Sequence, residues 1–154
     1  MSLQTAEQYE ENEQYTQAYE EYKKLHEKNP KDLSILERLG HLSMLLDNKE
    51  EAADFYTKIL EFDATNVLAY EQLMDIYVTT DRYKYYVYRG NLHSVEHQLE
   101  HAINDYKKAV NSAQEDKDML SARFVLGTLY EQTGNNVKEI GRAHVWTPVT
   151  SLSR

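Results

Sequence analysis

The chain contains no cysteine among its 154 residues, so disulfides and zinc sites built on thiolates are excluded. It has only 5 glycines and 2 prolines, too few for an all-β protein rich in turns. No apolar run approaches the ~20 residues that a membrane-spanning helix needs, and the polar N-terminal segment does not have the pattern of a signal peptide. We therefore expect a cytoplasmic protein with no membrane partner.

The composition favours helices and disfavours one class of partner. The formal net charge is −9, which argues against nonspecific nucleic-acid binding because such binding requires clustered lysine and arginine. An apolar fraction of 41% is enough for a core, and the abundant Glu, Lys, Leu, Ala and Gln favour helices. The aromatic residues are 13 Tyr, 3 Phe and 1 Trp, a bias that a repeat with tyrosine at fixed positions explains.

A small residue followed four positions later by tyrosine recurs along the chain. The pairs are Ala18 with Tyr22, Ala52 with Tyr56 and Ala102 with Tyr106, and the first two alanines are 34 residues apart. Gly40 and Gly90 each lie 12 residues before the alanine of the next pair. A fixed period of this length predicts a solenoid of stacked helix pairs, with small residues where two helices cross.

The spacing of apolar residues predicts helices separated by short turns. Asn29-Pro30 ends one helix because the residue before proline avoids helical backbone angles, and Asp32 is a candidate N-cap for the next. Gly134 is a candidate left-handed C-cap for the last helix, and we expect a polar linker over residues 111–118. The expected helices cover Gln4–Glu13, Tyr15–Lys28, Leu33–Leu46, Glu50–Phe62, Val67–Val78 and Leu120–Gln132, with another that carries Leu99 to Ala109.

The segment after Val78 breaks the period, because Ala52 and Ala102 are 50 residues apart. In one interpretation Tyr83 opens a new helix that carries Gly90, a turn follows near residues 96–98, and the helix at Val67 has no partner. In the other interpretation, residues 83–89 are that partner helix or an extended insert.

Segment by segment, the chain resembles the tetratricopeptide repeat family, whose units are helix–turn–helix motifs of about 34 residues. The best match covers residues 33–66, where Gly40, Ala52 and Tyr56 stand at the small and aromatic positions of the motif. The resemblance implies an all-α fold, a right-handed superhelical array of antiparallel helix pairs. It implies a repeat domain over residues 1–138 with about four units, one of them irregular near 79–98 and the last truncated.

Residues 139–154 do not continue the repeat. Glu139 and Ala143 stand where the pattern calls for a small residue and then an aromatic one, and Pro148 would break a helix there. The segment from Glu139 to Thr150 resembles the conceptual translation of a common sequencing adapter. We therefore expect a non-native or disordered tail on a fragment of a longer protein.

One short motif suggests an enzyme. His93, Glu96 and His97 fit H-x-x-E-H, in which two histidines bind zinc and the glutamate acts as general base. The repeat pattern places a turn between His93 and His101, and we expect this turn to separate the ligands. We therefore expect no enzyme, no metal and no cofactor, with a zinc-dependent hydrolase as the alternative.

The resemblance implies protein–protein interaction, with a partner segment bound on the concave face formed by the first helix of each unit. On this chain the face would be an acidic and apolar groove, suited to a peptide with a basic residue beside an apolar anchor. Another alternative is a purely structural connector, and the truncated last unit favours self-association. The tyrosines over residues 83–88 are either a peptide platform or packing between units. The candidate groove residues are Ser34, Glu37, His41, Met44, Leu45, Leu68, Glu71, Asp75, Val78, Lys84, Val87 and Asn91.

Overall fold

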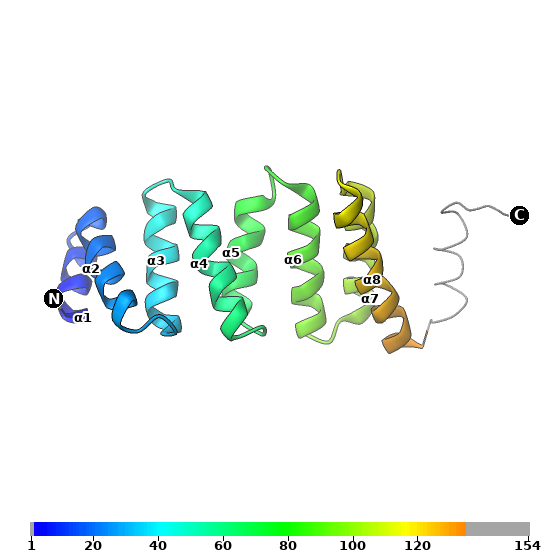
Figure 1. Ribbon diagram of the computed structural model, residues 1–154, viewed down its shortest axis with the longest axis horizontal. Helices are drawn as coiled ribbons and strands as arrows, with labels where there is room; N and C mark the ends of the chain where they lie inside the picture. Colours follow the sequence, from blue (N-terminus) through cyan, green and yellow to red (C-terminus); the bar gives the residue numbers. More distant parts are fainter. Residues whose placement is uncertain (1, 135–154) are drawn as a thin grey trace, which may run out of the picture. The chain divides into compact units, whose positions relative to one another are not determined.

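The computed structural model describes residues 2–134, and every regular element in that range is a helix (Figure 1). The predicted all-α fold is confirmed. The expectations for residues 139–154 lie outside the described residues. The helices are α1 (Leu3–Glu11), α2 (Tyr15–Lys28), α3 (Leu33–Leu45), α4 (Lys49–Phe62), α5 (Val67–Tyr77), α6 (Arg82–Val95), α7 (Leu99–Ser112) and α8 (Asp116–Thr133).

The described chain forms two compact units, one up to Ile76 and one from Tyr77 onwards. In the first unit α1 packs on α2, α2 on α3 and α3 on α4. In the second unit α6 packs on α7 and α7 on α8. The right-handed course of the whole array and the repeat domain over residues 1–138 stay predictions.

Three helix hairpins share one spacing of residues, which makes them structural repeats. Each has a small residue on its first helix, an alanine 12 positions later and a tyrosine 16 positions later. Seven positions after the small residue, Glu13, Asp47 and His97 take left-handed backbone angles, with φ of 57°, 60° and 61°. Non-glycine residues rarely adopt this conformation, so its recurrence shows that the three turns are built alike. The hairpins are α1–α2 with Ala6, α3–α4 with Gly40 and α6–α7 with Gly90.

Helix α8 has the same two features as the first helix of each hairpin. Gly127 occupies the small-residue position, and seven residues later Gly134 ends the helix with a φ of 77°. The predicted left-handed C-cap at Gly134 is confirmed.

Capping side chains explain several of the helix starts. Asp32 accepts hydrogen bonds from the backbone amides of Ser34 and Ile35, as predicted. Asn48 and Asp81 accept in the same way at the starts of α4 and α6. These bonds satisfy amides that have no partner within the helix.

The helices after Val78 follow the first of the two interpretations. Helix α6 is a complete first helix, the turn covers residues 96–98, and α7 is its second helix. The predicted polar linker over residues 111–118 was wrong at both ends, because α7 continues to Ser112 and α8 begins at Asp116. The carboxylates of Asp116 and Asp118 lie in the first turn of α8, where they interact favourably with the helix dipole.

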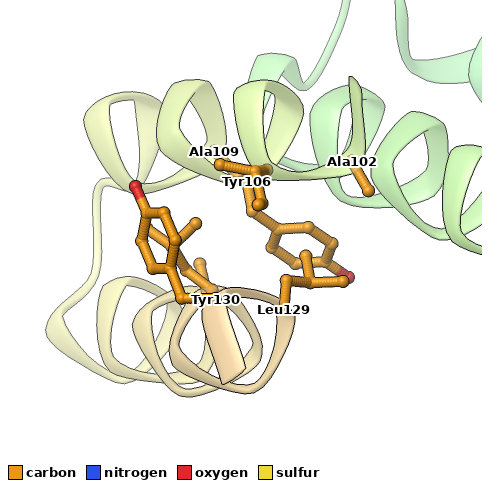
Figure 2. Close-up of a cluster of buried hydrophobic side chains, with 8 residues drawn as sticks. Ala102, Tyr106, Ala109, Leu129 and Tyr130 are labelled. Atoms are coloured by element: carbon orange, nitrogen blue, oxygen red, sulfur yellow. The ribbon is translucent and has the colours of Figure 1, made fainter. Parts of the chain in front are cut away.

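The small and aromatic residues of the repeat form the core of each unit. In the second unit Ala102, Tyr106 and Ala109 of α7 pack with Leu129 and Tyr130 of α8. Figure 2 shows the Tyr106 ring pointing from α7 toward α8, beside Leu129. The alanine and tyrosine positions that the repeat spacing predicts to lie in the core are therefore buried.

Candidate partner-binding surface

The contact between Gly40 and Tyr56 decides which side of α3 is exposed. A Cβ atom on Gly40 would lie 2.8 Å from Cζ of Tyr56, so only glycine lets the tyrosine ring approach this closely. Leu36, Leu39 and Ser43 are buried on the same helix, and the Ser43 hydroxyl donates to the carbonyl of Leu39 at 2.8 Å. The candidate groove residues of α3 lie on the remaining surface: Ser34, Glu37, His41 and Leu45 are exposed, and Met44 is half-buried.

Helix α5 is amphipathic in the same way. Its buried side carries Ala69, Tyr70, Leu73 and Ile76. The candidate groove residues of α5 are the exposed Glu71 and Asp75 and the half-buried Leu68. The first unit therefore carries eight of the twelve candidate residues, of which six are exposed and two are half-buried.

The carboxylates on these two helices are free to meet a ligand. Among the described residues, Glu37, Glu71 and Asp75 have neither a side-chain hydrogen bond nor an ion pair. Burial raises the pKa of Tyr56 to about 12, and the charge of Glu37 adds to the effect. The three carboxylates give the exposed sides of α3 and α5 a negative charge that no described cation neutralises through an ion pair.

The four candidates of the second unit differ in what they contact. Val78 is 49% exposed. Lys84 pairs with Asp81 at 3.9 Å and its Nζ lies 4.9 Å from the centre of the Tyr77 ring. Val87 packs against the core of the unit, and Asn91 accepts a hydrogen bond from the Tyr106 hydroxyl. Val87 and Asn91 therefore support the fold of this unit.

The tyrosines over residues 83–88 are all half-buried, so they are neither a free platform nor full core residues. Tyr83 and Tyr86 pack against the core of the second unit, and the Tyr83 hydroxyl donates to the carbonyl of Asp118 at 3.0 Å. The Tyr88 ring stacks on Tyr77, with 6.0 Å between the ring centres. Packing within the unit accounts for most of this cluster.

A polar cluster between α6 and α7 was not predicted from the sequence. Asp105 is only 2% exposed. Its Oδ1 accepts from Nε of Arg89 at 2.8 Å, and its Oδ2 lies 2.6 Å from Nδ1 of His93. Burial alone would lower the pKa of Arg89, but the hydrogen bond and charge of Asp105 raise it on balance. Arg89 also lies over the rings of Tyr85 and Tyr86, at 5.2 and 5.3 Å from their centres.

This cluster changes the interpretation of the H-x-x-E-H motif. His93 lies in the last turn of α6 with its Nδ1 at Asp105, whereas His97 lies in the turn with a positive φ. The expectation that the turn separates His93 from His101 was wrong. Helices α6 and α7 pack together, and the centres of the His93 and His101 rings are 5.3 Å apart. Even so, no group of three His, Asp or Glu side chains within residues 2–134 is arranged to hold a metal ion.

The second unit also has a small polar surface pocket of about 220 Å³. It lies between the start of α6 and the connection from α7 to α8. The lining mixes one arginine with three carboxylates, and none of the twelve candidate groove residues belongs to it. The lining residues are Thr80, Asp81, Arg82, Tyr83, Ser112, Gln114, Glu115 and Asp118.

No protein-family model matches the chain, and no curated protein matches it. A crystal structure of MamA is similar over 93% of this chain and 93% of its own, with 20% sequence identity and a TM-score of 0.47. A similarity at this level establishes neither a family nor a partner. No helix among the described residues is long and apolar enough to cross a membrane.

Proposed function

We propose that this chain is a protein-interaction scaffold that binds a partner segment on the exposed surfaces of α3 and α5. The observation that supports this function most directly is the set of carboxylates on those helices, Glu37, Glu71 and Asp75. They are exposed, and among the described residues they have neither a side-chain hydrogen bond nor an ion pair. Leu45, which is 45% exposed, and half-buried Met44 add apolar area on α3, the helix that also carries Glu37.

The chemistry of this surface suits a peptide with lysine or arginine next to an apolar anchor. Carboxylates mainly raise the association rate and select the partner, because exposed charges steer a ligand but contribute little net affinity. Burial of the apolar anchor supplies most of the affinity and slows dissociation.

The test uses a peptide selected from a random displayed library against the wild-type protein. Reversing two charges, Glu71→Lys with Asp75→Lys, replaces attraction of a basic peptide with repulsion. It is expected to weaken binding of this peptide by about tenfold, mainly through slower association, and to reduce the salt dependence of binding. Leu45→Ala is expected to raise the dissociation rate, and the exposure of Leu45 leaves the fold little affected. Surface plasmon resonance at several salt concentrations measures both effects.

A matched control has the same change in net charge at a different place in the unit. Asp54 and Glu61 are exposed on α4, and Asp54→Lys with Glu61→Lys is expected to leave the affinity within about threefold. Equal weakening by both pairs would mean that only the overall charge matters. Full binding by the Glu71 and Asp75 variant would place the site elsewhere.

A further inference from the structure

Two histidines meet where the α6–α7 hairpin turns. His93 lies in the last turn of α6 and His101 in the first turn of α7, so the turn over residues 96–98 joins the two helix ends that carry them. The ring centres are 5.3 Å apart and the ring planes are tilted by 42°. His93 is half-buried and His101 is exposed. An ion from the solvent can therefore reach both rings at once.

Asp105 holds the His93 ring in one orientation. Oδ1 of Asp105 pairs with Nη2 of Arg89 at 2.7 Å, while Oδ2 lies 2.6 Å from Nδ1 of His93. A carboxylate in an ion pair can only accept, so the hydrogen of the neutral ring is on Nδ1 and the lone pair is on Nε2. Histidines that bind metals are commonly held in this way, with the nitrogen that does not bind the metal donating to a carboxylate. His93 therefore already has the supporting contact of a metal ligand.

The fold does not use the remaining imidazole nitrogens. Nε2 of His93 makes no hydrogen bond with the described residues, and neither does either nitrogen of His101. The exposed His101 ring can therefore turn about its side-chain bonds without breaking a hydrogen bond. In a tetrahedral site with metal–nitrogen distances of about 2.0–2.1 Å, the centres of two bound imidazole rings are about 5–5.5 Å apart. The observed separation of 5.3 Å fits this arrangement.

We propose that His93 and His101 together bind a Zn²⁺ ion, which joins the end of α6 to the start of α7. Imidazole suits zinc well, and no third His, Asp or Glu among residues 2–134 is placed to join the two rings, so water completes the coordination. An ion that binds only the folded hairpin stabilises it. The expectation of no metal concerned His93, Glu96 and His97, whereas this site takes its second histidine from α7.

The test titrates ZnCl₂ into the full chain, purified without a histidine tag and freed of metal, and follows the heat of binding. His101→Gln removes one ligand and is expected to weaken binding by about tenfold or more, since loss of even a supporting contact costs about that much. Because His101 is exposed and makes no hydrogen bond with the described residues, this variant should melt like the wild type when no metal is present. Zn²⁺ should raise the melting temperature of the wild type and leave that of His101→Gln almost unchanged.

Two other exposed histidines provide matched controls. His41 lies on α3 in the first unit, and His97 is the second histidine of the H-x-x-E-H motif. His41→Gln and His97→Asn are expected to bind Zn²⁺ within about twofold of the wild type. Asparagine is chosen at position 97 because it tolerates the positive φ of this residue. With Cu²⁺ as a probe, electron paramagnetic resonance should show two bound imidazole nitrogens in the wild type and one in His101→Gln.

Three results would overturn the proposal. The wild type does not bind Zn²⁺, or His101→Gln binds it equally well, which would leave the two rings as a packing contact only. His97→Asn weakens binding as much as His101→Gln does, which would move the site to the H-x-x-E-H motif. None of these results bears on the surface proposed on α3 and α5, because the two sites share no residue.

Discussion

His26 shows how a single buried nitrogen links stability to pH. The side chain lies on α2, and its ring meets Phe55 of α4 edge-on, with 6.3 Å between the ring centres. Its Nδ1 is buried and has no hydrogen-bond partner among the described residues. Burial lowers the pKa of His26, and the positive charge of Lys58 lowers it further.

A lowered histidine pKa means that the unfolded chain binds a proton more readily than the folded chain. The contribution of His26 is therefore present above its unfolded pKa of about 6.5 and is lost as the pH falls through that value toward the folded pKa. We expect His26→Gln to reduce the loss of unfolding free energy between pH 7.5 and pH 5. Urea denaturation of both proteins at the two pH values measures this difference, and an identical loss in both would exclude His26 as a cause.

At the scale of the elements, the α6–α7 hairpin replaces apolar packing with a buried ion pair. Counted from the shared glycine and tyrosine positions, Arg89, His93 and Asp105 correspond to Leu39, Ser43 and Phe55 of the α3–α4 hairpin. A charge that is 2% exposed, as Asp105 is, carries a desolvation cost that its two partners offset. The same hairpin backbone thus accommodates either apolar packing or a buried ion pair at these positions.

This comparison predicts opposite results for breaking the cluster and for replacing it. Asp105→Asn leaves Arg89 and His93 with incomplete partners and should destabilise the protein by about 1–3 kcal/mol. The triple change Arg89→Leu, His93→Ser and Asp105→Phe copies the other hairpin and should be neutral, or stabilising by about 1–4 kcal/mol. Chemical denaturation decides between them, and a triple variant less stable than Asp105→Asn would contradict the comparison.

Element positions were largely predictable because the repeat spacing marks both helices of a hairpin. The first interpretation of residues 83–109 was correct for this reason, since Gly90 and Ala102 keep the 12-residue spacing. The predicted linker over residues 111–118 was wrong because a run of polar residues does not by itself end a helix, and acidic residues are favourable at the start of a helix such as α8. The Arg89 cluster was missed because its members are scattered in sequence. Aligning the hairpins would have shown charged residues at apolar positions.

For the whole molecule, the sequence predicts which residues are buried in the core more reliably than which residues form a binding surface. Burial follows from spacing, so Ala52, Tyr56, Ala102 and Tyr106 could be assigned to the core in advance. A ligand surface depends on which exposed side chains remain without partners after folding. Val87 and Asn91 show the difficulty, because both were candidate groove residues and both make contacts within their own unit.

Glycine on the first helix of a hairpin is required only where the tyrosine of the second helix covers it. Unfolding measurements on three matched variants, Gly40→Leu, Gly90→Leu and Gly127→Leu, test this most directly. We expect the first two to lose about 1–3 kcal/mol, because the new side chain collides with Tyr56 or Tyr106. Gly127→Leu should instead gain about 0.5–1 kcal/mol, since leucine is the better helix former and the position is open among the described residues. Equal losses at all three positions, or no loss at Gly40 and Gly90, would mean that contact with the tyrosine ring does not determine where glycine is required.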